Sequence, residues 1–488
     1  MGVVNTCAKA PKVNYERHCP EKGLLYRTIE QNWPSFVAKC EAEHQPIPAF
    51  IKKEFSAYLR CGVLAYGFAR IYCQECRYDR LVAFSCKKRG FCGSCLARRM
   101  SETAARLGDS IIPEIPTRQW VLSVPAPLRY LIAYDNEALN FVVRAFTGSL
   151  FSYLRKKAKR SGGEALDAQA YHPGAVTFIQ RFGSALNLNV HFHSQVSDGA
   201  YVKYGKDKIR FIRVPSPSLA EIRRITIKIA NRVHRYLEAR MHDLECDGLL
   251  DKQPMLAKCY AASIRYLSAL GINSGKPLLR LISPELIKTD IYEEGTVLGF
   301  NLHASQATEA HDRRGLERIL RYMGRPPLSS HRLQLAPDGK NLILLLKTPW
   351  RDGTSSILLS PFDLLERLVA LIPAPRKNQI RYHGFLGPNA ELRGELLSHI
   401  EKKGDILKTK IYKPKFADLM WRVFDIDVLS CPRCFSRMQI ISFIKEARVI
   451  TSILKSLKMT TAPPQVFKPD EYTVCYEEEA DLFMDDMQ

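Results

Sequence analysis

The stretch "LNLNVHFHSQV", Leu186 to Val196, holds two histidines one residue apart in a run that alternates apolar and polar side chains. Successive side chains of a β-strand point to opposite faces, so His191 and His193 would point the same way. On a helix, two positions apart means a divergence of about 200°. Two neutral imidazoles on one face can share a metal ion. The pattern therefore predicts a metal-binding strand, with hydrogen-bonded strand histidines as the alternative.

A hard divalent ion held by imidazoles needs oxygen ligands and water to complete its shell, which leaves room for an oxygen atom of a bound phosphate. Gln180, on the preceding predicted strand, is the candidate third ligand, with Asp198 and His303 as further candidates. Gln180 shares its strand phase with the apolar Val176 and Phe178. We therefore expect a β-bulge to turn its side chain towards the histidines.

Fourteen cysteines occur in the chain, and six of them form three C-x-x-C pairs. Cys73/Cys76 and Cys92/Cys95 are separated by fifteen residues, which is the spacing of a four-cysteine zinc ribbon. These four thiols are the predicted ligands of a closed, structural Zn²⁺ site. Cys86, between the two pairs, is either a packed side chain or a substitute ligand.

The third pair, Cys431-Pro-Arg-Cys434, is followed by only one more cysteine, Cys475. Half of a zinc site is a weak signal. A degraded or shared metal site and a simple turn both stay open for this pair.

The 488 residues exceed the size of one ordinary core, so we expect two to four domains. The formal charge of +22 favours a polyanionic partner such as DNA, RNA or an anionic membrane surface. No apolar run is long enough to span a bilayer, and no secretory signal opens the chain. A soluble, cytoplasmic protein without a membrane partner is therefore expected.

Hydrophobic periodicity predicts both helices and strands. Helices are expected at about 24–40, from residue 50, at 128–159, in the basic stretch 206–245 and at 312–328, and strands at 118–124, 175–182, 186–196 and 294–305. Strands separated by long helices indicate an α/β or α+β sheet domain.

Seven sequence blocks carry a resemblance to a known family. They are "YLRCGVLAYGFAR", "LVAFSCKKRGFCGSC", "RQWVLSVP", "FGSALNLNVHFHS", "RYMGRPPLS", "RYHGFLGPNAELR" and "DIDVLSCPRC". Over about residues 46–440 the chain resembles the rolling-circle HUH insertion-sequence transposases that carry an N-terminal zinc ribbon. The resemblance implies that His191 and His193 bind Mg²⁺ or Mn²⁺ and that Tyr322 cleaves single-stranded DNA. Some relatives carry a second tyrosine four residues earlier, where this chain has Arg318.

The resemblance also implies an α+β fold with a zinc ribbon followed by an HUH endonuclease domain, an antiparallel-rich sheet flanked by helices with helical insertions. The expected divisions are a variable leader (1–48), a zinc-binding ribbon (49–105), an HUH domain (106–395) with a basic helical insertion at about 206–260, a C-x-x-C segment (396–440) and a tail (441–488) that is acidic and disordered at its end.

The expected reaction is nicking and rejoining of single-stranded DNA at element ends through a 5′-phosphotyrosine, with target DNA as second partner, near the bacterial nucleoid. A phenol with a pKa near 10 needs an ion, a base or nearby cations to become a nucleophile. The expected DNA contacts are basic: Arg321, Arg325, Lys87, Lys88, Arg89, Arg98 and Arg99. A monomer and a homodimer both stay open.

Two other functions compete with this one. The first is a zinc-ribbon DNA-binding protein without catalysis. The second is a metal-dependent hydrolase of small molecules, which would usually need further ligands and would leave the +22 charge unexplained.

Overall fold

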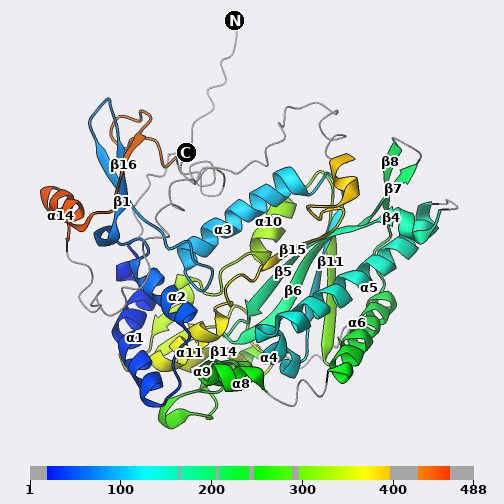
Figure 1. Cartoon of the computed structure of the whole chain (residues 1–488), viewed down its shortest axis with the longest axis horizontal. Helices are drawn as coiled ribbons and strands as arrows, with labels where there is room; N and C mark the ends of the chain where they lie inside the picture. The colour runs from blue at the N-terminus through cyan, green and yellow to red at the C-terminus, as the bar shows by residue number, and fades with distance from the viewer. Residues whose placement is uncertain are drawn as a thin grey trace, which may run out of the picture. The chain divides into compact units, whose positions relative to one another are not determined.

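The computed structural model describes residues 19–162, 166–204, 208–240, 247–287, 296–395, 422 and 427–461 (Figure 1). The chain forms two compact units: one comprises residues 33–54 and 89–412, the other residues 1–32, 55–88 and 413–488. Helices α1 (Leu24–Ala42) and α2 (Ala49–Arg60) come first.

The larger unit is built on a six-stranded sheet in which every neighbouring pair is antiparallel. Its spatial order is β10 (Thr296–Val297), β11 (Phe300–Thr308), β3 (Thr117–Ser123), β6 (Leu188–Ser197), β5 (Gly174–Phe182) and β15 (Ile380–Gly384). The histidine strand β6 is therefore central, and it pairs with β3 on one side and β5 on the other.

Helices cover both faces of this sheet (Figure 1). On one face, Val176 and Phe178 of β5 pack in a core cluster with Leu316 and Leu320 of α10 (Arg313–Met323), next to α3 (Gly93–Arg106). On the other face lie α4 (Ala126–Tyr134) and α5 (Asn136–Gly162), which contact β6 and the strands beside it. Since both faces are covered, apolar side chains occur in both strand phases.

Further elements surround this core. A small sheet contains β4 (Tyr171–His172), β7 (Gly199–Tyr204) and β8 (Lys208–Arg213), and another contains β12 (Leu333–Leu335), β13 (Leu342–Leu345), β14 (Thr354–Leu359) and β9 (Arg280–Ile282). The remaining helices are α6 (Leu219–Ala239), α8 (Gly248–Lys252), α9 (Pro254–Arg265) and α11 (Pro361–Leu371). Ser218 and Glu221 form a capping box that fixes the start of α6.

The smaller unit contains an antiparallel sheet of three strands in the order β16 (Gln439–Ile444), β1 (Phe68–Tyr72) and β2 (Asp79–Ala83). Helix α14 (Ala447–Ser456) places Ile450 and Leu454 in a core with Leu64, Phe68 and Leu81. The C-terminal part of the chain thus completes a sheet begun near the N-terminus.

Most of the expected elements are confirmed, including the helices near 24–40 and 312–328 and the strands near 118–124, 175–182 and 186–196, which are β3, β5 and β6 of the central sheet. The strand expected at 294–305 is the hairpin of β10 and β11. The helix expected at 128–159 is two helices, α4 and α5, which meet at Asp135. The prediction of a helix from residue 206 was wrong at its start. Basic and apolar side chains alternate in Lys208–Arg213, and this segment pairs with β7 as strand β8.

The predicted tail is partly ordered, since residues 441–461 contain the end of β16 and helix α14. Its acidic end, from residue 462, and residues 1–18 of the leader lie outside the described residues. Among the residues that the structure describes, none of the helices combines the length and apolar character needed to cross a bilayer.

Candidate active site and cysteine centres

Strand β6 brings the two predicted histidines together. His191 and His193 are both buried, and their Nε2 atoms lie 3.1 Å apart. Adjacent ligands of an octahedral ion with bonds of about 2.1 Å are separated by about 3 Å, so this spacing suits one shared ion. The two histidine side chains therefore lie on one face of the strand, as the alternation of residues 186–196 predicted.

Hydrogen bonds to the Nδ1 atoms of the two rings determine whether each Nε2 atom has a lone pair available for a shared metal ion. His191 Nδ1 lies 2.8 Å from the carbonyl oxygen of Asn189, which can only accept, so Nε2 carries the free lone pair. His193 Nδ1 lies 3.0 Å from the amide nitrogen of Gln119 on β3, which donates to it. Rotating the Gln119 amide by half a turn would present an oxygen instead and free Nε2 of His193 for a metal.

Burial lowers the pKa of His191 to about 4 and that of His193 to about 3, and the neighbouring charge of Arg325 acts in the same direction. Both rings are therefore neutral at pH 7. Neutral imidazole is the form that binds metal ions, so burial preorganises the pair for an ion at ordinary pH.

Gln180 lies directly opposite His191 in the pairing of β5 with β6, which puts both side chains on one face. The expected bulge is not needed for this, and the observed irregularity falls after Gln180, between it and Phe182. Gln180 Nε2 donates to the main-chain oxygen of Met323 at 2.6 Å. Its Oε1 is buried and accepts no hydrogen bond, so it is an available oxygen ligand.

The other two candidate ligands, Asp198 and His303, are not available to the same ion as Gln180. Asp198 forms a buried bidentate ion pair with Arg118, with N–O distances of 2.8 and 3.0 Å, which occupies its carboxylate. His303 of β11 shares a face with His193 because both pair with Val121, but it is exposed and two strands away. Two strand spacings are about 10 Å, too far for one ion.

Tyr322 lies at the C-terminal end of α10, next to His193. Its ring is perpendicular to that of His193, with centroids 6.0 Å apart, and its side chain is 42% exposed. The Arg325 guanidinium and the Lys347 ammonium lie 4.2 and 4.3 Å from its ring centroid. Burial by itself would raise the pKa of Tyr322, but hydrogen bonds and charge from these two cations outweigh it, so the pKa falls below its ordinary value.

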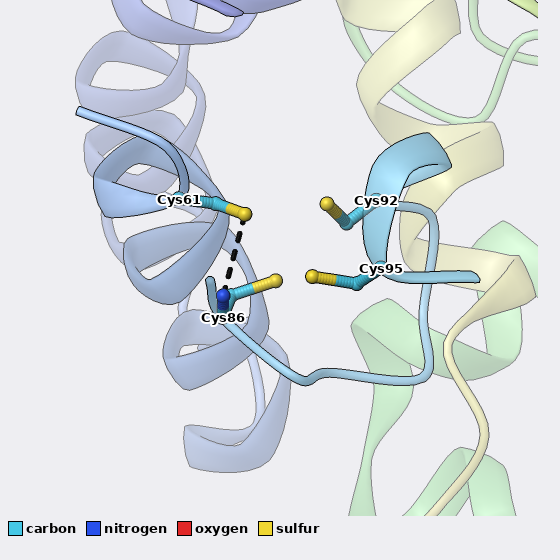
Figure 2. A group of neighbouring side chains, drawn as sticks. All are labelled: Cys61, Cys86, Cys92 and Cys95. Atoms are coloured by element: carbon cyan, nitrogen blue, oxygen red, sulfur yellow. Dashed lines mark hydrogen bonds between the residues drawn. The ribbon is translucent and has the colours of Figure 1, made fainter. Parts of the chain in front are cut away.

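The cysteines group differently from the predicted ribbon. Figure 2 shows the sulfur atoms of Cys61, Cys86, Cys92 and Cys95 pointing towards one another, all within 4.8 Å. The main-chain N–H of Cys86 donates to Cys61 Sγ at 3.3 Å. Cys86 is thus part of the group, and Cys61 joins it in place of the pair Cys73/Cys76.

The predicted ligand set of Cys73, Cys76, Cys92 and Cys95 was therefore wrong as one set. The reason is the β1–β2 hairpin, in which Tyr72 pairs with Asp79 and Phe68 pairs with Ala83. Cys73 and Cys76 lie in the turn at its tip, whereas the residues just outside its base lead to Cys61 and Cys86. A five-residue strand separates tip and base by about 17 Å. Cys73 and Cys76 lie instead with Cys431 and Cys434.

Comparisons with known proteins match two parts of the chain. Residues 28–124 match the family described as "Transposase zinc-binding domain", and residues 174–392 match the family described as "Putative transposase". Two parts of the chain are therefore similar to transposases. The chain is 22% identical over 394 residues to the transposase for insertion sequence element IS801 of Pseudomonas savastanoi pv. phaseolicola, covering 78% of this chain and 80% of that one. No solved structure is significantly similar to the chain.

A cavity of about 520 Å³ in the larger unit borders the histidine site. Gln180, Met323 and Arg325 line it from the site, and Arg99 and Arg106 line it from α3. Arg325 Nη1 is buried and makes no hydrogen bond. A cavity rich in guanidinium groups beside a metal-binding face suits a phosphate-bearing ligand.

The basic residues predicted to contact DNA occupy several places. Arg321 is partly exposed on α10 next to Tyr322, and Arg98 and Arg99 lie on α3. Arg89 is exposed and also borders the cavity, and Lys87 and Lys88 lie between β2 and α3. Their contact with DNA stays a prediction.

Three members of these sites were not predicted from the sequence: Gln119, Lys347 and Cys61. Gln119 and Lys347 belong to no sequence motif. Gln119 reaches the site through the pairing of β3 with β6, and Lys347 reaches it from a loop. Cys61 was a lone cysteine, although it stands in one of the blocks that resemble the family. Cys431/Cys434 gave a signal, but nothing in the sequence identified its partners.

Proposed function

We propose that the chain is a transposase that nicks and rejoins single-stranded DNA at element ends, with Tyr322 as nucleophile and His191, His193 and Gln180 as ligands of a divalent ion. The observation that carries this proposal is that Tyr322, whose pKa is lowered, lies edge-on to His193 of a buried pair of neutral histidines. No other function in the sequence analysis needs that combination.

The donor set fits a hard divalent ion. Two Nε2 atoms lie 3.1 Å apart, and the Gln180 oxygen lacks a hydrogen-bond donor. Mg²⁺ or Mn²⁺ bound there would withdraw charge from a non-bridging phosphate oxygen and so make the phosphorus a better electrophile. Three protein ligands leave coordination positions open for water and for that oxygen.

Arg325 and Lys347 prepare the nucleophile. Both cations stabilise the phenolate of Tyr322 over the phenol. The Tyr322 oxygen then attacks phosphorus, the bond from phosphorus to the 3′ oxygen breaks, and that oxygen takes up a proton to become a free 3′-OH. The product is a 5′-phosphotyrosine.

Rejoining is the reverse of this step with a different strand. A 3′-OH of the target attacks the phosphotyrosine, a phosphodiester forms, and Tyr322 leaves as the phenol after reprotonation. One ester bond is exchanged for another in each step, so strand transfer needs no nucleotide hydrolysis. Arg321 and Arg325 are proposed to bind the phosphates that flank the scissile bond, with the DNA backbone entering the basic cavity.

Incubation with labelled single-stranded end DNA and Mn²⁺, resolved on a denaturing gel, tests the proposal. Wild-type protein should form a covalent protein–DNA band that depends on the metal, and Tyr322→Phe should form none. Tyr236→Phe is the matched control. Tyr236 belongs to α6, and its ring stacks on Phe141 and not on a residue of the candidate site. An adduct formed by Tyr322→Phe would exclude Tyr322 as nucleophile.

A further inference from the structure

The strongest unassigned feature is the second group of cysteines, which joins the two ends of the smaller unit. Cys73 Sγ lies 3.4 Å from Cys434 Sγ, and Cys76 Sγ lies 3.4 Å from Cys431 Sγ. All four sulfur atoms lie within 4.8 Å of one another. The pair at 431–434 stands outside the matched zinc-binding domain, which ends at residue 124.

These distances suit a tetrahedron of thiolates. Four sulfurs at about 2.3 Å from a central Zn²⁺ are about 3.8 Å apart. A disulfide would require about 2.05 Å between two sulfurs. The observed 3.4 Å separations are too long for two disulfides and close to the edges of a zinc tetrahedron.

The two C-x-x-C segments have the same local fold. The N–H of each first cysteine donates to the carbonyl five residues later, Cys73 to Tyr78 and Cys431 to Ser436, both at 2.9 Å. The residue after each second cysteine has a left-handed backbone, with φ 56° at Arg77 and 61° at Phe435.

Amide donors also meet the second sulfur of each segment in the same way. The main-chain N–H of Tyr78 donates to Cys76, and that of Ser436 donates to Cys434. N–H groups aimed at sulfur stabilise the thiolate form that binds a metal. Two loops with one geometry, 355 residues apart in the chain, face each other as the halves of one site.

Contacts around the sulfurs position the two halves without a metal. Strand β16 pairs with β1 from Phe68↔Ile444 to Tyr72↔Gln439, which aligns the two loops at one end of the sheet. Arg80 is buried and donates to the carbonyls of Val428 and Ser430. Ile71 and Met438 pack against Cys73 and Cys431.

We propose that Cys73, Cys76, Cys431 and Cys434 bind a second structural Zn²⁺, so that the C-terminal segment completes the zinc-binding part of the chain. Four thiolates leave no open coordination position, which makes the site structural and not catalytic. The described residues then provide two zinc sites, one at Cys61/Cys86/Cys92/Cys95 and one here. The inference does not rest on the DNA-cleaving function.

Zinc content of the full-length protein, purified without chelator and measured by mass spectrometry of the metal, tests the proposal. Wild type should hold two zinc ions per chain, and the double variant Cys431→Ser/Cys434→Ser should hold one. Cys259→Ala, a buried cysteine outside both groups, should hold two. Two zinc ions in the double variant, or one in wild type, would overturn the proposal.

Alkylation of wild type provides a measurement that needs no variant. Cys434 is exposed, so a free thiol there would react quickly with iodoacetamide. The zinc-loaded protein should protect all four cysteines, and a chelator should release them together, at least 10-fold faster, as read by peptide mass spectrometry. Equal labelling of Cys434 with and without chelator, or a disulfide in non-reduced peptides, would contradict the site.

Discussion

The side-chain nitrogen of Gln180 donates a 2.6 Å hydrogen bond to the main-chain oxygen of Met323, the residue that follows Tyr322. One side chain therefore links the face of the central sheet that carries His191 and His193 to the end of the helix that carries Tyr322, the proposed nucleophile. Its two ends have separate tasks in the proposed site, since the nitrogen is bonded to the end of α10 and the oxygen is the proposed ligand.

Substitutions at Gln180 should separate these tasks. Gln180→Ala removes both the ligand oxygen and the donor, so we expect a 10- to 100-fold loss of apparent Mn²⁺ affinity in cleavage assays. Gln180→Glu keeps a ligand oxygen but loses the donor to Met323, so metal affinity should persist while the cleavage rate at saturating Mn²⁺ falls. Equal metal dependence of wild type and Gln180→Ala would remove Gln180 from the ligand set.

Gln119 should control metal binding through the tautomer of His193. Gln119→Glu places a carboxylate against Nδ1, which then keeps its proton and leaves Nε2 free for the ion. Gln119→Leu removes that partner. We expect Gln119→Glu to bind Mn²⁺ at least as tightly as wild type and Gln119→Leu to bind it about 10- to 100-fold more weakly, as measured by calorimetric titration.

The cations beside Tyr322 predict a shift of the pH profile. Removing Lys347 as Lys347→Met, or Arg325 as Arg325→Gln, should raise the pKa of Tyr322 because each stabilises the phenolate. The cleavage rate at pH 7 should fall, on the order of 100-fold, and the rise of rate with pH should move to higher pH. A lower rate with an unshifted profile would indicate that these residues only bind DNA.

The neutral histidines predict an acid-dependent stability of the metal-free protein. The unfolded chain takes up protons on His191 and His193 near pH 6.5, whereas the folded values are about 4 and about 3. Between these values the unfolded state binds more protons, so stability falls as pH is lowered from about 6.5 to about 4. His193→Gln should show a shallower fall of Tm over that window, and a parallel curve would contradict the burial of a neutral ring.

The Arg118–Asp198 pair should anchor the far end of β6. Both side chains are buried, so Asp198→Asn leaves a guanidinium without its counter-charge and should cost about 3–5 kcal/mol of unfolding free energy. The exposed pair Arg213–Glu309 is the control, and Glu309→Gln should cost about 0–1 kcal/mol. Chemical denaturation measures both, and similar costs would refute the distinction.

Prediction from the sequence was most accurate for residues that lie on a single strand. The alternation of residues 186–196 placed His191 and His193 on one face, and the family resemblance pointed to Tyr322, which lies beside His193. Gln180 was harder to place because its apolar phase-mates, Val176 and Phe178, suggested the core face. Both faces of the sheet are in fact buried, so apolar neighbours do not tell which face holds the site.

The cysteines show the limit of spacing arguments. The interval between Cys76 and Cys92 fits a ribbon, but it is occupied by strand β2 and the segment that returns to Cys61. Strand pairing fixes distances that a count of intervening residues does not contain. The partners of Cys431 and Cys434 depend on the pairing of β16 with β1, which is a contact between distant parts of the chain.

That pairing has a consequence for synthesis on the ribosome. Cys73 and Cys434 are 361 residues apart, which corresponds to about 20 to 70 s of translation at about 5–20 residues per second. During this interval strand β1 has an open edge, and open edges recruit other strands. A nascent or truncated chain that ends before β16 is therefore the form of this protein most exposed to aggregation.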